Sequence, residues 1–247
     1  MSEIPPPSNG SSAPAHLHPR IVPWRHALAW YEEAMRLFKR APGTWVGLAV
    51  ITIVAEIALT AAPGVGALLS QVVTPLVACG LLFAAAAADR GDAPSLRLAT
   101  AAFRAPLAAI AAVVASALVT FAAEALAAWW TSGANLLAGG SGMASLSPAA
   151  VAGIYTIGIL ASLPVMFVPF HVLFERVPPG AAFAASWSAF ALNTPPLLAY
   201  SAASLVLLGF GVATMGLGLV LALPLWAASS YAAWKDIFGI RDAPGGR

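Results

Sequence analysis

The chain has 247 residues, of which 60% are hydrophobic and only 9% are charged, whereas about 25% of the residues of an ordinary soluble domain are charged. A net charge of +2 is too small to suggest a nucleic-acid partner, and the single cysteine, Cys79, excludes a disulfide framework or a thiolate metal site. The composition therefore predicts an all-α membrane protein, because lipid is the solvent in which so apolar a surface is tolerated.

The amino-terminal segment has two parts. Residues 1–22 are rich in Pro, Ser and Ala and lack the apolar centre of a secretory signal peptide, so we expect a disordered cytoplasmic tail. Residues 24–40 place aromatic and apolar side chains at helical spacing, with charged side chains in between. Such a pattern is typical of an amphipathic helix lying in the membrane surface. The alternative is a cytoplasmic helix packed against the protein's own loops.

Segments long enough to cross the hydrocarbon core follow along the rest of the chain. The last apolar stretch, 196–234, is about twice as long as one span requires, and glycines near its middle predict a tight turn around 212–216. We therefore predict a six-helix transmembrane domain over 23–238 and a cytoplasmic tail at 239–247. Its helices are expected at 44–62, 67–88, 106–130, 148–174, 196–212 and 217–236.

The twelve Lys and Arg residues orient these helices. All of them fall on one side of the predicted membrane, and the opposite loops at 63–66, 131–147 and 212–216 contain none. By the positive-inside rule, both ends of the chain are expected in the cytoplasm of a bacterium, with the chain in the inner membrane. A five-pass arrangement would place the last three basic residues on the wrong side.

The pattern of 24–40 recurs more weakly at 94–104 and 179–194, and each of the three segments ends in a Phe followed shortly by a Pro. The returning helix of each predicted pair also contains an internal proline, at Pro75, Pro164 with Pro169, and Pro224. We therefore expect three hairpins, each preceded by a cytoplasmic-side amphipathic interfacial helix, an arrangement that sets architecture rather than activity. Alternatively, lipid imposes the same solution three times.

Three stretches carry a family resemblance: VPWRHALAWYEEAMRLFKRAPGTWVGL at 22–48, AAAADRGDAPSLRLATAAFR at 85–104 and SSYAAWKDIFG at 229–239. With these residues the chain resembles a family of uncharacterised proteobacterial multi-pass inner-membrane proteins. More distantly, its layout is similar to the membrane domains attached to some bacterial glycerophosphodiester phosphodiesterases, whose hydrolase domain it does not contain. The resemblance implies a topology and no established activity.

Two acids fall inside the predicted spans, Glu56 in the first and Glu124 near the outer end of the third. An ionisable group at membrane depth is expensive, so each is a candidate for proton exchange during transport. The alternative is a carboxyl group hydrogen-bonded to a neighbouring helix, with Gln71, Thr60 or Tyr155 as partner. Glu124 is also close enough to the outer interface to extend toward water.

The sequence contains none of the common catalytic or nucleotide-binding motifs, so we expect no enzyme, no cofactor and no metal. His171 and Glu175 are four residues apart on one helical face, but two ligands are too few for a metal. Their neighbours Phe170, Phe174 and Arg176 favour an anchor at the membrane interface.

Two functions remain. The first is a non-enzymatic scaffold, assembly or membrane-organising factor that binds anionic headgroups, a membrane-protein partner or a second copy of itself. Its lipid or partner face is expected to comprise Trp24, Arg25, Arg36, Lys39, Arg40, Arg97 and Arg104. The second is a transporter of small molecules or ions that uses Glu56. A cavity reaching Glu56 would favour transport, and a solid bundle would favour the scaffold.

Overall fold

The computed structural model describes residues 17–62, 65–136 and 146–240, and every regular element within these ranges is a helix. The predicted all-α class is therefore confirmed. The expected turn at 63–64, the centre of the 131–147 loop and most of both predicted tails lie outside the described residues. The elements are α1 (His26–Arg40), α2 (Pro42–Thr60), α3 (Gly66–Arg90), the 3₁₀ helix η2 (Leu96–Arg104), α4 (Leu107–Ser132), α6 (Pro148–Ser162), α7 (Val168–Leu173), α8 (Pro179–Leu192), α9 (Thr194–Ala213) and α10 (Leu219–Phe238).

Four of these helices, α2, α3, α4 and α9, are long and apolar enough to cross a membrane. They coincide with the spans predicted at 44–62, 67–88, 106–130 and 196–212. The shortest of them has 19 residues, or about 28 Å at 1.5 Å per residue, which matches the hydrocarbon core. The chain therefore has the helices of a multi-pass membrane protein.

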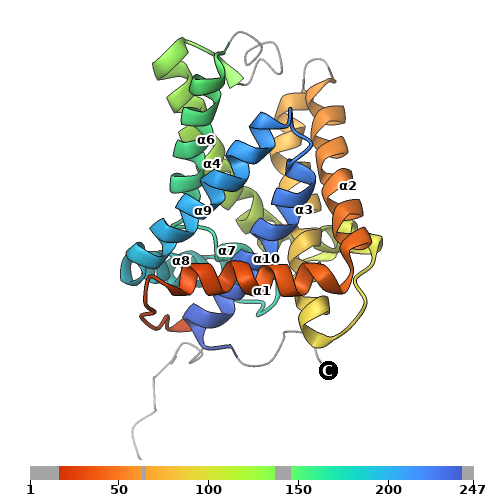
Figure 1. Cartoon of the computed structure of the whole chain (residues 1–247), viewed down its shortest axis with the longest axis vertical. Coiled ribbons are helices and arrows are strands. Elements are labelled where there is room, and N and C mark those ends of the chain that lie inside the picture. Colours follow the sequence, from red (N-terminus) through yellow and green to blue (C-terminus); the bar gives the residue numbers. More distant parts are fainter. Residues whose placement is uncertain (1–16, 63–64, 137–145, 241–247) are drawn as a thin grey trace, which may run out of the picture.

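The long helices run between two ends of the molecule, and α1 lies across one of them (Figure 1). The two termini of the described chain meet at this end, where the Arg20 N–H donates to the Ile237 carbonyl at 2.8 Å. We call this the inner end, after its expected orientation, and the opposite one the outer end.

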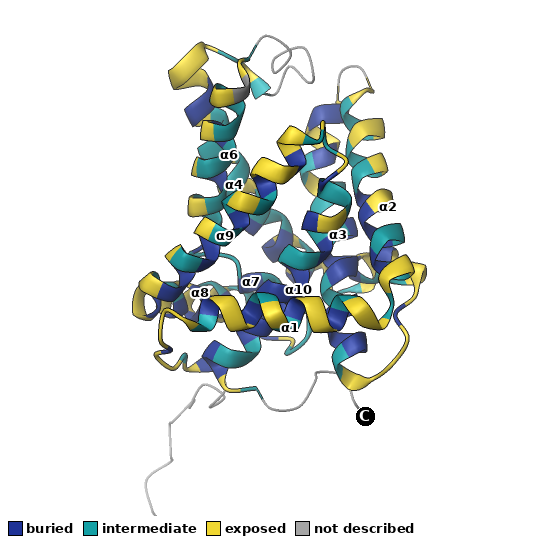
Figure 2. Ribbon diagram, in the orientation of Figure 1, coloured by how far each residue is buried: buried dark blue, intermediate teal, exposed yellow. Residues whose placement is uncertain are grey.

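Helix α10 passes through the middle of the bundle and contacts α1, α2, α3 and α9. Ala222, Ala228 and Ala233 on it are completely buried, and small side chains of this kind let neighbouring helices approach closely. Figure 2 shows the burial concentrated on α10 and on the surfaces turned toward it, while the outer faces of α2 and α9 are exposed. The exposed residues of these two helices include Val54, Ile57 and Val206, as lipid-facing helices require.

The helix expected over 148–174 is interrupted in the structure. Helix α6 ends at Ser162, α7 begins at Val168, and the intervening residues form a turn that includes Pro164. Proline has no N–H and its ring clashes with the preceding helical turn, which breaks the helix. The Phe167 N–H that follows the break donates to the Ser186 hydroxyl of α8 at 3.2 Å. This bond satisfies a backbone group that lipid could not.

The second surface segment is also different from its prediction. Residues Leu96–Arg104 form a 3₁₀ helix rather than an α-helix, and it packs against α2 and α3. The close approach depends on glycine, because a Cβ at Gly80 would lie 2.7 Å from the Ala99 Cα. Gly47 of α2 is likewise in contact with Leu96. The small residues at these positions therefore serve packing within the chain.

The predicted disordered tail ends earlier than residue 22. Leu17 and Val22 are buried, and the Asn193 side chain joins this segment to the α8–α9 junction. Its amide oxygen accepts from the Val22 N–H at 2.9 Å, and its amide nitrogen donates to the Arg20 carbonyl at 3.1 Å. Residues 17–22 therefore belong to the folded part of the chain.

The turn expected around 212–216 lies between Ala213 and Leu219. Gly216 has φ +90° in this turn, a conformation that costs glycine little and strains other residues.

Candidate functional site

Glu56 lines a cavity of about 440 Å³ between α2, α3, α4 and α6. Its carboxylate accepts a hydrogen bond from the Thr74 hydroxyl of α3 at 2.7 Å. Thr60 and Gln71, two of the partners expected from the sequence, line the same cavity, but the Thr60 hydroxyl donates to the Glu56 backbone carbonyl instead. The expected kind of partner, a polar side chain on a neighbouring helix, is therefore present at Thr74.

Glu124 lines this cavity and also a second one, of about 470 Å³, between α4, α6, α9 and α10. Tyr155 of α6 also lines both cavities. No hydrogen bond or ion pair joins the Glu124 carboxylate to another residue of the described ranges. The two acids predicted from the sequence therefore meet at one cavity, with different surroundings.

A third cavity, of about 320 Å³, lies between α3, α4, α9 and α10. It shares Pro75 with the Glu56 cavity, and it shares Thr120, Ser162 and Trp226 with the Glu124 cavity. The three cavities therefore adjoin one another. No Lys, Arg or His is among the described residues that line them, so Glu56 and Glu124 set the sign of the local field.

Glycine at position 158 makes room for the Glu124 side chain. A Cβ built at Gly158 of α6 would lie 2.7 Å from the Glu124 Cδ and Cγ. Helix α4 packs closely on α6, so the carboxylate occupies the space that a side chain at 158 would need. The α4–α6 contact thus fixes where the charge lies.

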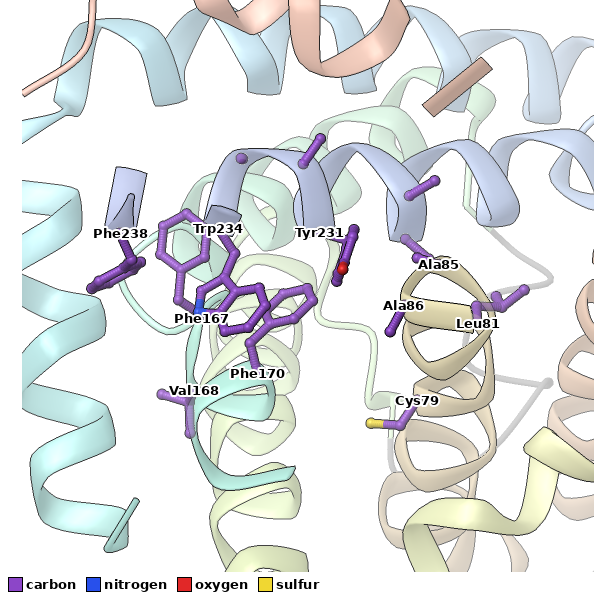
Figure 3. Close-up of a cluster of buried hydrophobic side chains, with 14 of the residues drawn as sticks. Cys79, Leu81, Ala85, Ala86, Phe167, Val168, Phe170, Tyr231, Trp234 and Phe238 are labelled. Carbon is purple, nitrogen blue, oxygen red and sulfur yellow. The ribbon is translucent and has the colours of Figure 1, made fainter. Parts of the chain in front are cut away.

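Aromatic side chains fill the core between the cavities and the inner end. Phe167, Phe170, Tyr231 and Trp234 are completely or almost completely buried, and their side chains lie between α10 and the α7 segment (Figure 3). The Phe170 and Trp234 rings stack with centroids 5.2 Å apart and 15° between their planes. Among the described residues, these rings form a packed layer that joins α7 to α10.

His171 belongs to this layer and is not an interface anchor. It is 0% exposed, its ring packs edge-on against Phe238 with centroids 4.5 Å apart, and its Nδ1 lies 2.5 Å from the Glu175 carboxylate. The two side chains share one face as expected from their spacing, but burial removes His171 from the lipid interface. No group of three or more His, Cys, Asp or Glu side chains in the described ranges could hold a metal ion.

Asp236, near the end of α10, connects three separate parts of the chain. Its carboxylate accepts from the Arg20 guanidinium at 2.5 Å and from the Trp30 indole N–H at 2.9 Å, and it lies 2.7 Å from the His26 Nδ1. The buried face of α1 (Ala27, Trp30, Ala34 and Leu37) packs beneath these bonds. The first surface helix is therefore held on the last helix of the bundle.

Asp89, at the end of α3, forms a second junction. It accepts from the Tyr231 hydroxyl at 2.8 Å and from the Lys235 ammonium at 2.5 Å, and the Arg36 guanidinium of α1 lies 3.9 Å away. On α1, the Tyr31 ring stacks on the Tyr200 ring of α9, with centroids 5.5 Å apart. The Tyr31 hydroxyl is 2.7 Å from the Ser204 hydroxyl. Burial raises the pKa of the Tyr31 hydroxyl, so it stays protonated. The helices at the inner end are thus held together by paired charges as well as by aromatic packing.

The predicted lipid or partner face divides into two groups. Trp24 is 63% exposed, and Arg25, Lys39, Arg97 and Arg104 are also exposed. Arg36 pairs with Glu33, and the Arg40 guanidinium donates to the Ala88 carbonyl. All seven residues are exposed, but only Arg36 and Arg40 also make contacts within the described chain that engage their charges.

Asp89 and Asp236 are absent from the site residues predicted from the sequence. Each lies beside a basic residue at the end of a helix, which is also the ordinary arrangement of a solvated helix terminus. The informative signal is that both acids follow long Ala-rich runs whose neighbours are buried. Comparison of the chain with family models, with curated proteins and with solved structures finds no match, so the family resemblance stays a prediction.

Proposed function

We propose that the protein crosses a bacterial inner membrane six times, with both ends of the chain in the cytoplasm. The four candidate spans support this arrangement, and α6 with α7 and α10 would supply the other two. All the described Lys and Arg residues lie before α2, from the last residue of α3 to the start of α4, after α7, or in the last turn of α10. These places are on the side that the positive-inside rule assigns to the cytoplasm. In this arrangement α1, η2 and α8 are the three surface segments.

We further propose that the protein is a transporter of a small solute and that Glu56 and Glu124 exchange protons during transport. The cavity that contains both acids carries this proposal. Carboxylates are expensive within a membrane and are retained there for function. The sequence alone favours a scaffold, but a cavity that reaches Glu56 is the observation that favours transport.

The packing of the two ends supports an alternating-access mechanism. The Glu56 and Glu124 cavities lie toward the outer end, and the aromatic layer and the Asp89 and Asp236 junctions lie toward the inner end. A separate hollow of about 460 Å³ at the inner end is lined by Arg20, Glu33 and Asp236, among others. The break between α6 and α7 lies next to the third cavity, which Ser162, Met166 and Pro169 help to line. Transporters commonly bind their substrates at such discontinuous helices and open to each side in turn. The described conformation would then be the outward-facing one.

Cysteine labelling tests this mechanism. Thr120→Cys, in a Cys79→Ala background, introduces a thiol where two cavities meet. A membrane-impermeant thiol reagent is expected to modify it in both right-side-out and inside-out vesicles. Trp130→Cys and Trp24→Cys, both at exposed positions, serve as markers for the outer and inner sides. Labelling of Thr120→Cys from one side only would show a static pocket and contradict transport.

The Glu56→Gln substitution tests whether Glu56 exchanges protons during transport. The substitution keeps the shape of the side chain and removes the ionisable group, so any proton-coupled flux through the protein should be lost. The readout is a pH-sensitive dye inside proteoliposomes. Unchanged flux would remove Glu56 from the mechanism.

The second candidate function is organisation of the membrane surface, and one observation favours it. Trp24, Leu28 and Met35 form an exposed apolar stripe along α1, at 63%, 61% and 39% exposure. The exposed charges Arg25 and Lys39 lie beside this stripe on the helix. A stripe of this kind fits the headgroup region of an anionic bilayer. Both functions are non-enzymatic, and they are compatible in one protein.

A further inference from the structure

We propose that the cavity around Glu124 is the binding site for an organic monovalent cation with a large apolar body, such as a hydrophobic amine or a quaternary onium ion. This inference rests on the proposed transport function and names its substrate class. The step from cavity to ligand depends on the charge, the walls and the unpaired groups of this one cavity.

The first observation is the charge that Glu124 brings to the cavity. Glu124 has no hydrogen-bond or ion-pair partner within the described residues, whereas Glu56 accepts from Thr74. An unpaired carboxylate in an apolar surrounding is costly, and a bound cation removes that cost. Because no basic residue lines the three adjoining cavities in the described ranges, the site would repel an anion.

The second observation is that the walls of the cavity are apolar. The Glu124 cavity is lined mainly by aliphatic side chains, among them Ile159, Leu208, Val212, Leu219 and Leu223. A small inorganic cation needs several oxygen ligands in place of its water, and these walls do not supply them. An apolar ligand body is stabilised by such walls, and about 470 Å³ lies within the usual range for organic ligands.

Two aromatic residues complete the site. Tyr155 and Trp226 line the same cavity, and aromatic faces attract organic cations through their π systems. The Trp226 indole nitrogen is buried without a hydrogen-bond partner in the described chain. It leaves a donor free for an acceptor group on the ligand. The cavity therefore offers aromatic faces, a hydrogen-bond donor and a carboxylate.

Proton and cation would compete for one carboxylate. The titratable groups among the described lining residues of the adjoining cavities are Glu124 on α4, Glu56 on α2, Tyr155 on α6, Cys79 on α3 and Tyr200 on α9; the described lining residues of α10 include none. A cation that enters displaces the Glu124 proton, and protonation releases the cation. This exchange couples the site to the proton movement proposed above.

Equilibrium binding to the purified full-length protein tests the proposal. Tetraphenylphosphonium is the probe, and binding is followed by calorimetry in detergent. We expect saturable binding that weakens as the pH falls, and no binding of tetraphenylborate, an anion of the same shape. Glu124→Gln should weaken tetraphenylphosphonium binding by about tenfold or more, equivalent to about 1.4 kcal/mol. The matched control is Asp92→Asn, which neutralises an acid that is 61% exposed and lines none of the three cavities, and it should bind with an affinity near that of the wild type.

Gly158→Ala gives a second, independent variant. The added methyl displaces the Glu124 carboxylate without removing its charge, so binding should weaken although the charge is retained. Size-exclusion profiles and thermal midpoints identify variants that do not fold, and Glu124→Asp replaces any that fail. The proposal is overturned if Glu124→Gln binds tetraphenylphosphonium as tightly as the wild type does. It is also overturned if the wild type binds tetraphenylborate and tetraphenylphosphonium equally well.

The result is separable from the transport test. Tetraphenylphosphonium binding with one-sided labelling of Thr120→Cys would leave the cation site standing and remove transport. Two-sided labelling without tetraphenylphosphonium binding would leave transport standing and exclude this substrate class.

Discussion

The two ends of the molecule treat charge in opposite ways. At the inner end, Asp89 and Asp236 each accept from several donors and lie beside packed aromatic rings. Toward the outer end, Glu124 has no partner in the described chain, and the space around it is open. The inner charges therefore stabilise the fold, whereas the outer charge lowers its stability. Such a cost is typical of functional sites.

The largest effect is expected in the aromatic layer. Trp234→Ala removes a side chain that is 0% exposed and contacts Phe170, Tyr231 and Phe174, so the free energy of unfolding should fall by about 3–5 kcal/mol. The measurement is the thermal midpoint in detergent. Trp187→Ala is the control, since this ring is 60% exposed and its loss should cost less than about 1 kcal/mol. Equal losses would show that the layer is not a specific core.

Loss of the Asp236 junction comes next. Asp236→Asn removes the charge that holds Arg20, His26 and Trp30, and the free energy of unfolding should fall by about 2–4 kcal/mol because the remaining donors are left without a charged acceptor.

The control for Asp236→Asn is Asp92→Asn. Its side chain is 61% exposed and pairs with Arg90 at 2.9 Å, and exposed pairs contribute about 0–1 kcal/mol. Limited proteolysis of residues 17–40 adds a local readout, because α1 should be released in Asp236→Asn and retained in Asp92→Asn. Retention of α1 in both variants would contradict the role of this junction.

Most of the difference between the inner and outer ends could not be predicted from the sequence. Hydropathy predicts α2, α3, α4 and α9 because each span is a local run of apolar residues. Asp236 and Arg20 are 216 positions apart, and no local pattern reports which ends of a bundle meet. Pro164 was visible in the sequence, but a proline either kinks a membrane helix or breaks it, and the outcome here depends on Ser186 as a partner for Phe167. The two acids were identified from membrane depth alone, whereas their shared cavity requires the packing of four helices.

Neutralising Glu124 should change the stability in the opposite direction to neutralising Asp236. Because its carboxylate has no partner in the described residues, Glu124→Gln should leave the thermal midpoint unchanged or raise it, by up to about 1 kcal/mol of unfolding free energy. Asp236→Asn is the direct comparison, as the same chemical change at the inner end lowers the midpoint. A fall of similar size in both variants would mean that Glu124 has a structural role, and the contrast between the two ends would be lost.

The last effect concerns lipid at the inner end and is read as a change in lipid-dependent stabilisation. In nanodiscs, anionic lipid should raise the thermal midpoint of the wild type, and Arg25→Gln with Lys39→Gln should remove part of the rise, because each basic residue near an anionic surface contributes about 1 kcal/mol. Arg36→Gln is the matched control, since Glu33 already pairs with this charge, and it should keep most of the lipid effect. High salt should weaken the rise in every variant. Equal stabilisation by neutral and anionic lipid would exclude headgroup binding by α1, and would leave the exposed stripe of Trp24, Leu28 and Met35 as an apolar contact with the bilayer alone.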